Sequence, residues 1–425
     1  MRYTSVNIDN IISLLANVLY LIDRYHFNVD RAFTYTCRKY RCSSPQFTRE
    51  DLFDIAHEFI SKYLMIKSLA EHLGRKNLSY RMYAKLFLYL KFRDLGISIP
   101  SKLGKVILRD FGKIDVDNVL QELEPWEILS YPHWIYSRLV EVLEENEVKE
   151  MLKAMNRRTI WLRINTLKVD PDKAIKMLDT EGVKFEVDKR IPFIVKIISS
   201  PKPPRILKIV KEGGAIIQDR ASVLTVIAMD PKPGDNIYDF AAAPGIKTSL
   251  IMQLTENRAH VIAFDRSPRR VIFMKSLLKK FGVDVEKIHI LLTDSRIVSL
   301  SKRADIALVD APCSSSGAIP KDPSIKLMLK NPSIPMKMHQ IQVQMLHNAL
   351  KYSERVVYAT CSILPEEGEE VVEEIITRTG AGLEDINIPA NRGYKKYKVW
   401  AKTRRTYPHI DECEGFFTAK LVPAP

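Results

Sequence analysis

Residues 239–248 read DFAAAPGIKT, and this stretch decides the fold that we predict for the second half of the chain. It joins a short apolar run at 236–240 to a helical pattern, and its small residues would let the backbone approach a ligand closely. Further apolar runs alternate with helical patterns at 260–265, 287–294, 304–311 and 355–360. Buried parallel strands read as continuous apolar segments. Their alternation with helices predicts a doubly wound α/β sheet.

Acidic residues stand at the ends of three successive predicted strands: Asp239, Asp265 and Asp294. Each could simply cap the helix that follows it. In doubly wound sheets, however, ligands bind outside the carboxyl ends of the strands, and an acid about 20 residues after the glycine loop binds ribose hydroxyls. Three acids at one sheet edge, beside a loop of small residues, favour a ligand site over three separate caps.

Two cysteines follow the next two predicted strands. Cys313 lies in DAPCSSSG at 310–317, and Cys361 lies in the TCS sequence at 360–362. If these strands are neighbours, both thiols face the same crevice, although a buried structural cysteine is the usual alternative. Cys361 precedes Pro365 and two acids that resemble a first helical turn, and a helix N-terminus can lower a thiol pKa and supply a nucleophilic thiolate.

Composition sets limits on the class of protein. The chain has 425 residues, 46% of them hydrophobic, which is enough for two to four domains. Its net charge of +14 favours a polyanion such as nucleic acid as the partner, the alternative being a basic enzyme that binds none. The five cysteines do not form a disulfide framework, and Cys37 and Cys42 lack a second pair for a metal site. Because no second pair accompanies Cys37 and Cys42, we expect no metal ion. Neither a signal peptide nor a membrane span is visible in the sequence, so we expect a cytoplasmic protein.

The chain divides into three predicted segments. Residues 1–125 read as helical throughout and begin with an amphipathic helix that we expect to face a core. Near residue 126 the pattern changes to strand-like runs at 159–167, 184–187 and 193–198, with a helix that starts at 170. We therefore predict an all-helical N-terminal domain at 1–125, a small α/β module at 126–212 and the doubly wound domain at 213–425.

Four motifs together resemble those of RNA cytosine-C5 methyltransferases of the Fmu/Sun (NOL/NOP/Sun) family: DFAAAPGIKT, DAPCSSSG, ATCSILPEEGE at 359–369 and RTYPHIDECEGFFTAKL at 405–421. The resemblance runs from about residue 131 to the C-terminus. It implies a Rossmann-like, S-adenosylmethionine-dependent methyltransferase domain that follows an RRM-like module and acts on RNA. Some bacterial relatives also carry a NusB-like RNA-binding domain, which residues 1–125 match in length and helicity.

The resemblance implies roles for single residues. Cys361 is then the nucleophile, Cys313 assists product release, and Lys247 and Asp310 lie near the reacting base. The implied cofactor site comprises Ala242, Ala243, Pro244, Gly245, Ile246 and Lys247, together with Asp265, Arg270, Asp294 and Asp310.

A thiolate meets a chemical need of this reaction. Carbon 5 of cytosine is a weak nucleophile until a thiolate adds to carbon 6 and creates an enamine-like intermediate. Carbon 5 can then take the methyl group, after which a base removes its proton and the thiolate is eliminated. A carboxyl group such as that of Asp310 could hydrogen-bond the ring nitrogen and stabilise the charge of the intermediate.

Two departures from the family pattern leave an alternative open. The family commonly reads CAAPGGKT, whereas this chain has Ala241 in place of the cysteine and Ile246 in place of the second glycine. Ile246 narrows the room beside the cofactor, which motivates the alternative of a non-catalytic RNA-binding ribosome-assembly factor with a relict cofactor site. A DNA cytosine methyltransferase with Cys313 as nucleophile is a third hypothesis, against which the TCS motif argues.

The sequence does not specify which RNA is bound. No appended domain that reads transfer RNA is recognisable, which favours ribosomal RNA slightly over transfer RNA, and a monomer is the default expectation. The segment 391–405 interleaves basic residues with Tyr394, Tyr397 and Trp400. This pattern suits phosphate contact with base stacking, or equally a strand pair with one basic solvent face.

Overall fold

The computed structural model describes residues 8–40, 47–112 and 115–424. The chain forms two compact units, one of Met1–Asn156 with Ile319–Asn331 and the other of Arg157–Ala318 with Pro332–Pro425. None of the helices in the described ranges combines the length and apolarity that crossing a bilayer requires.

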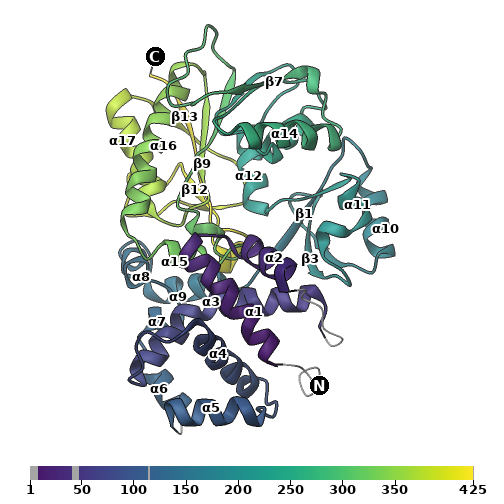
Figure 1. Ribbon diagram of the computed structural model, residues 1–425. Coiled ribbons are helices and arrows are strands. Elements are labelled where there is room, and N and C mark those ends of the chain that lie inside the picture. Colours follow the sequence, from purple (N-terminus) through teal and green to yellow (C-terminus); the bar gives the residue numbers. More distant parts are fainter. Residues whose placement is uncertain (1–7, 41–46, 113–114, 425) are drawn as a thin grey trace. The chain divides into compact units, whose positions relative to one another are not determined.

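The first unit is helical, as the sequence predicts for its N-terminal part (Figure 1). Thr48 and Asp51 form a capping box at the start of one long helix, where the Thr48 hydroxyl accepts a hydrogen bond from Asp51 N at 3.1 Å. The first helix buries Leu15 and Leu19, so its apolar face is turned to a core as expected. The helices are α1 (Ile8–Tyr25), α2 (Val29–Tyr40), α3 (Arg49–His72), α4 (Tyr80–Asp94), α5 (Ser101–Phe111), α6 (Val116–Glu122), α7 (Pro125–Ile128), α8 (His133–Val140), α9 (Glu145–Ala154) and α15 (Ile325–Met328).

Helix α15 comes from the second half of the sequence but belongs to this helical unit. Its Lys326 is fully buried and donates hydrogen bonds to Ser61 O at 2.9 Å and to Asn156 Oδ1 at 2.5 Å. Burial holds the pKa of this lysine well below its usual range. Helices α8 and α9 also belong to this unit, and our division of the chain at residues 125 and 212 stays a proposal.

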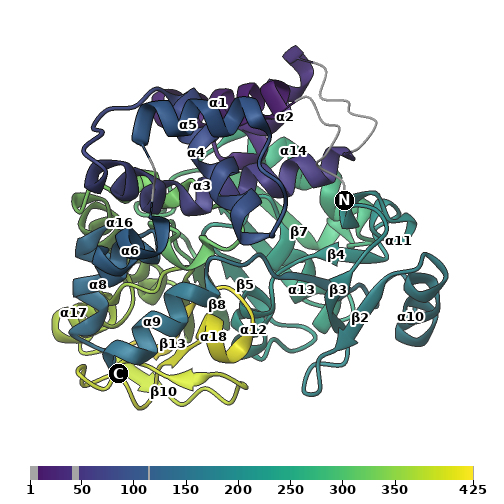
Figure 2. The ribbon, with the colours of Figure 1, turned by 90° about the horizontal axis from the view of Figure 1, so that it is seen from below.

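The predicted small α/β module is present and has the RRM-like pattern. Its antiparallel sheet has the order β2-β3-β1-β4. Strands β2, β3 and β4 of this sheet are labelled in Figure 2. Asp170 caps the helix of this module that begins at Pro171, because its carboxylate accepts a hydrogen bond from Asp172 N at 3.0 Å. The helix therefore starts where the sequence predicts. Trp161 on the central strand is buried and donates a hydrogen bond to Glu412 O at 2.9 Å, so it is a core residue and not an exposed stacking platform. The elements are β1 (Ile160–Ile164), α10 (Pro171–Thr180), β2 (Lys184–Val187), β3 (Ile194–Ser199), α11 (Lys208–Lys211) and β4 (Ala215–Ile217).

The predicted doubly wound sheet is confirmed. Its strand order is β11-β12-β13-β9-β8-β5-β6-β7, with β10 paired to β13. The strands β5 to β9 are parallel, and β13 runs antiparallel to β9. The strands are β5 (Asn236–Asp239), β6 (His260–Asp265), β7 (Ile288–Leu292), β8 (Ile306–Asp310), β9 (Val356–Thr360), β10 (Gly382–Glu384), β11 (Asn391–Arg392), β12 (Arg404–Arg405) and β13 (Phe417–Val422).

Helices cover both faces of this sheet. Alternate residues of β8 divide between two cores: Leu308 packs with α12 (Arg220–Met229), α13 (Ile246–Leu254) and α14 (Pro268–Lys280), whereas Val309 packs with α16 (Ser333–Lys351) and α17 (Glu369–Thr379). Figure 1 shows α16 and α17 on one side of β9 and α12 with α14 on the other.

The strand order also places the candidate site. Strand β5 lies between β6 and β8, so the order of the strands reverses at β5. In open α/β sheets ligands bind at such a switch point, outside the carboxyl ends of the strands. The loop 239–248 leaves β5 at this edge, and the loops that carry the two cysteines leave β8 and β9 at the same edge.

Candidate active site

The DFAAAPGIKT loop is held together by its own first residue. Asp239 is buried and accepts a hydrogen bond from Thr248 Oγ1 at 2.7 Å, and burial raises its pKa to about 6. One of the three acids that the sequence singles out therefore lies under the loop. Gly245 has φ of +95°, and a Cβ at this position would lie 2.8 Å from Met274 Cγ, so a side chain there would be both strained and crowded.

Ile246, the departure from the family pattern, is the first residue of α13 and is half-buried against the apolar core beneath the sheet edge. Packing of this side chain against a core gives a structural reason for a large residue in place of glycine.

Asp265 and Arg270 meet the same loop. Asp265 ends β6, is nearly buried and accepts a hydrogen bond from Ser267 N at 2.8 Å. Arg270 in α14 lies 3.4 Å from an Asp265 carboxylate oxygen and donates a hydrogen bond to Ala243 O. Arg270 thus links the acid at the end of β6 to the small-residue loop after β5.

Asp294 follows β7 and is half-exposed. Arg296 lies 2.6 Å from its carboxylate and holds the pKa of Asp294 below its usual range. The neighbouring Ser295 donates a hydrogen bond to Phe240 O at 2.6 Å, which ties this segment to the loop after β5. All three acids therefore stand at one sheet edge, as predicted, although Asp239 is turned inward.

Lys247 and Asp310 form an ion pair between the first turn of α13 and the end of β8. Lys247 Nζ lies 2.6 Å from Asp310 Oδ2. Burial disfavours the charged lysine, but the Asp310 carboxylate outweighs it and raises the pKa of Lys247. Lys247 also interacts electrostatically with Cys361, so this cation links the end of β8 to the TCS loop.

The two cysteines meet. The Cys313 and Cys361 sulfur atoms are 3.0 Å apart, because β8 and β9 are adjacent parallel strands in register. Both thiols are free and partly accessible, whereas Cys37 takes part in a disulfide bond. The contact with Cys361 and burial together raise the pKa of Cys313 well above its usual value, so Cys313 is a protonated thiol at neutral pH.

The turn after Cys361 differs from the prediction. Pro365 opens only a short 3-10 turn, η4 (Pro365–Glu367), and the α-helix begins at Glu369. Gly368 separates the two with a backbone conformation of φ −122° and ψ −100°, which is outside the helical region. An α-helix N-terminus therefore does not follow Cys361 directly, and the nearby cation is Lys247.

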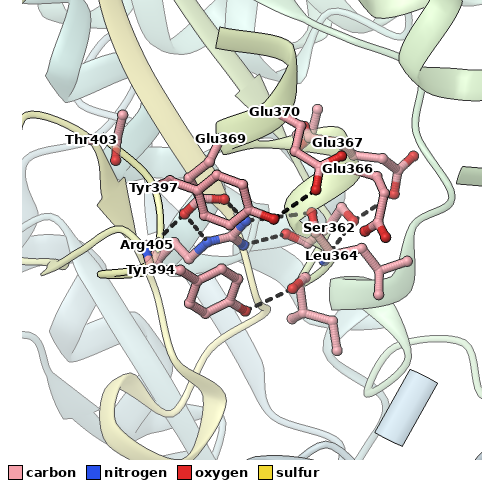
Figure 3. Close-up of polar contacts among 12 residues, drawn as sticks. Ser362, Leu364, Glu366, Glu367, Glu369, Glu370, Tyr394, Tyr397, Thr403 and Arg405 are labelled. Carbon is pink, nitrogen blue, oxygen red and sulfur yellow. Dashed lines mark hydrogen bonds and ion pairs between the residues drawn. The ribbon is translucent and has the colours of Figure 1, made fainter. Parts of the chain in front are cut away.

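Two buried side chains that the sequence patterns did not predict hold the TCS loop in place. Arg405 is buried and pairs with Glu369 at 2.6 Å, and it donates hydrogen bonds to Ser362 O at 2.9 Å and Leu364 O at 3.4 Å (Figure 3). Tyr394 is also buried and donates to the carbonyl oxygen of residue 363 at 2.7 Å. These two members of the basic-aromatic segment 391–405 thus brace the backbone after Cys361 and do not face solvent.

Two glycines explain why the C-terminal motif accompanies the cysteine motifs. Gly317 N donates to Cys361 O at 3.0 Å, and Gly415 N donates to Gly317 O at 3.0 Å. A Cβ on Gly317 would lie 1.8 Å from Gly415 O, so only glycine fits at this crossing. The DECEG turn therefore packs directly on the loop that follows Cys313.

Comparisons with known proteins agree with this arrangement. A family model described as 16S rRNA methyltransferase RsmB/F matches residues 226–422, and one described as the ferredoxin-like domain of RsmF/B-like methyltransferases matches residues 131–201. Ribosomal RNA small subunit methyltransferase B of Klebsiella pneumoniae is 31% identical over 338 residues, which cover 77% of this chain and 74% of the relative. The Escherichia coli O6:H1 protein of the same name is 30% identical over 339 residues, covering 77% and 75%.

Two solved structures are also similar. The crystal structure of PH0851 has a TM-score of 0.79 and 27% identity and covers 98% of this chain and 99% of its own. The structure of NSun6 from Pyrococcus horikoshii with SFG has a TM-score of 0.63 and 23% identity, covers 69% of this chain and 98% of its own, and supports the fold alone.

Proposed function

Because this chain belongs to the RsmB/F family of rRNA methyltransferases, we propose that it forms 5-methylcytosine in small-subunit ribosomal RNA through a covalent adduct on Cys361. The chain is an S-adenosylmethionine-dependent RNA methyltransferase. The observation that carries the finer proposal is the 3.0 Å contact between Cys313 and Cys361, beside a lysine–aspartate pair at the switch point of the sheet.

The residues at the sheet edge fit the cofactor. Gly245, with its positive φ and no side chain, lets the loop 242–247 lie close against Met274 and Leu278 of α14. Asp265 presents a nearly buried carboxylate at the strand end where such folds bind a ribose. Arg270 and Asp294 flank the same edge. When bound there, S-adenosylmethionine supplies an electrophilic methyl group.

The protein residues would handle the base. A Cys361 thiolate adds to carbon 6 and forms the sulfur–carbon bond, while the electron pair of the carbon 5–carbon 6 double bond shifts toward ring nitrogen 3, which takes up a proton from water. Asp310 would accept a hydrogen bond from that N–H, and Lys247 would hold Asp310 in place. After methylation a water molecule acts as the base that takes the carbon 5 proton, the carbon 5–carbon 6 double bond re-forms, and the sulfur leaves carbon 6 as a thiolate. Nitrogen 3 returns its proton to water, so that neutral 5-methylcytosine is released. Cys313 would assist this elimination, because its protonated thiol touches the departing sulfur.

Bisulfite sequencing tests the proposed function. The purified protein, incubated with S-adenosylmethionine and unmodified small-subunit ribosomal RNA, is expected to convert a cytosine to 5-methylcytosine. Transfer RNA and a DNA copy of the same sequence serve as parallel substrates. If only transfer RNA is modified, the substrate is transfer RNA and not ribosomal RNA. If only DNA is modified, the hypothesis of a DNA methyltransferase with Cys313 as nucleophile is favoured. If no substrate gains 5-methylcytosine, the proposal is contradicted.

Calorimetry with S-adenosylmethionine separates an enzyme from an assembly factor with a relict site. We expect the wild-type chain to bind the cofactor and Asp265→Ala to weaken binding by about 10²-fold, since two hydrogen bonds to a carboxylate contribute about 3 kcal/mol. Glu286→Ala, an exposed acid in the same unit, is the control and should bind as the wild type does. No measurable wild-type binding would favour the assembly factor.

A further inference from the structure

A single buried carboxylate joins the loops of the two cysteines. Glu367 in η4 is fully buried. Its Oε1 accepts a hydrogen bond from Ser314 N at 2.6 Å, and its Oε2 accepts from Ser314 Oγ and from Ser362 Oγ, both at 2.5 Å. Ser314 is the residue after Cys313, and Ser362 is the residue after Cys361. One side chain therefore binds both cysteine loops at equivalent positions.

The residues before the two cysteines are tied to the same point. Thr360 donates from its hydroxyl to the backbone oxygen of Glu367 at 3.0 Å. Gln342 of α16 donates to Pro312 O at 2.9 Å and to Glu367 Oε1 at 3.3 Å. Each cysteine is thus flanked on both sides by residues that Glu367 contacts, directly or through Gln342.

Burying the Glu367 carboxylate costs folding free energy, so a contribution to stability does not by itself explain this arrangement. Burial raises the pKa of Glu367, while hydrogen bonds from Ser314 and Ser362 oppose the shift. These donors are neutral hydroxyl and amide groups, so the carboxylate is solvated by the loops themselves. An apolar side chain could fill such a space without desolvating a charge, whereas only an acceptor with two oxygens can hold donors from both loops together.

We infer that Glu367 is a positioning residue that keeps the Cys313 and Cys361 sulfur atoms in contact, so that attack and release take place at one base. This inference rests on the proposed function. It adds to that function a residue, Glu367, that controls the distance between the two thiols without contacting either sulfur atom itself. Strands β8 and β9 bring the two cysteines to neighbouring positions, and the short contacts of Glu367 to Ser314 and Ser362 then fix the separation of the two thiols.

Glu367→Gln is the test variant, because it preserves shape and removes one acceptor. Its oxygen must stay opposite Ser314 N, so its amide NH2 replaces the oxygen that binds the two serine hydroxyls. We expect kcat for RNA methylation to fall by about 10²-fold, the order expected for a misplacement near 1 Å, with KM and cofactor affinity within about twofold of wild type. Glu373→Gln is the matched control: this acid of α17 binds Lys398 N at 2.5 Å, outside both cysteine loops.

A second readout reports thiol geometry without any methyl transfer. The azo oxidant diamide takes up two hydrogen atoms from a thiol pair and leaves a disulfide, and sulfur atoms already in contact react as an intramolecular pair. Mass spectrometry of digests should show a Cys313–Cys361 disulfide in the wild type and in Glu373→Gln. In Glu367→Gln we expect it to form about tenfold more slowly. A residue needed only for folding would lower thermal stability without this selective change.

If Glu367→Gln does not fold, variants that each remove one of the two serine hydroxyls bound by Glu367 test the same inference. Ser362→Ala removes the contact of the Cys361 loop with Glu367, together with the hydroxyl contact to Ser316 at 2.8 Å, and should slow adduct formation. Ser314→Ala removes the hydroxyl contact of the Cys313 loop with Glu367 and should slow product release. Wild-type kcat and disulfide rates in Glu367→Gln, or in both serine variants, would overturn the inference. A slower disulfide in Glu367→Gln, with no 5-methylcytosine made even by the wild type, would refute the proposed function and retain the positioning role.

Discussion

Replacing Cys361 with alanine is expected to abolish 5-methylcytosine formation, lowering turnover by at least about 10⁴-fold. Without the thiolate, nothing adds to carbon 6, and carbon 5 of cytosine stays too weak a nucleophile to take the methyl group. Lys247 and Asp310 remain paired at 2.6 Å in such a variant, so cofactor and RNA binding should persist. Turnover is measured by transfer of a radiolabelled methyl group to RNA.

Cys413→Ala is the matched control for this substitution. Cys413 is also a free cysteine of the same unit, but it is buried and burial keeps its pKa well above its usual value, so it has no nucleophilic role to lose. We expect this variant to methylate RNA at close to the wild-type rate. Activity that survives in Cys361→Ala and disappears in Cys313→Ala would reverse the assignment of the nucleophile.

The main outline of the catalytic unit could be predicted because it depends on local patterns. Each buried strand is recognisable in the sequence as a run of apolar residues. The carboxyl ends of parallel strands lie at the same edge of the sheet. The sequence pattern alone predicts that Cys313 and Cys361 follow neighbouring strands, and in the structure their sulfur atoms are 3.0 Å apart. The roles of the two cysteines do not follow from that geometry, since either thiol could attack.

The support of the site could not be predicted in the same way, because it depends on pairing between distant segments. The segment 391–405 reads as a basic, aromatic surface, yet the pairing of β12 with β13 carries Arg405 inward, where Glu369 neutralises it. Charge and aromatic content are properties of a local window, whereas burial is a property of the whole sheet. A usable signal existed nonetheless, since Arg405 and Glu369 both lie within the motifs that carry the family resemblance.

The same limit explains why the turn after Cys361 was predicted wrongly. Proline followed by two acids is a sound helix-start signal, but Gly368 interrupts it, so the turn after Cys361 is not the start of α17. Here a backbone conformation that the local pattern does not specify overrides the local preference.

Replacing Cys313 with alanine is expected to stop the reaction after methyl transfer and to trap a covalent protein–RNA adduct. Release requires the sulfur of Cys361 to depart as a thiolate, and Cys313 is the protonated thiol in contact with it. A hydrogen bond to that sulfur stabilises the charge that develops as the bond to carbon 6 breaks. Without it, turnover should fall by at least about 10³-fold while the first methyl transfer proceeds.

The adduct is measured as a labelled band that resists denaturant on a gel and holds one methyl group per trapped RNA. The double variant Cys313→Ala, Cys361→Ala is the control and should trap none, because the attacking sulfur is gone. Rapid turnover by Cys313→Ala would exclude its role in release, and an adduct in the double variant would exclude Cys361 as the attachment point. An adduct that requires Cys361 and accumulates only when Cys313 is absent would assign attack on carbon 6 to Cys361 and release of the product to Cys313.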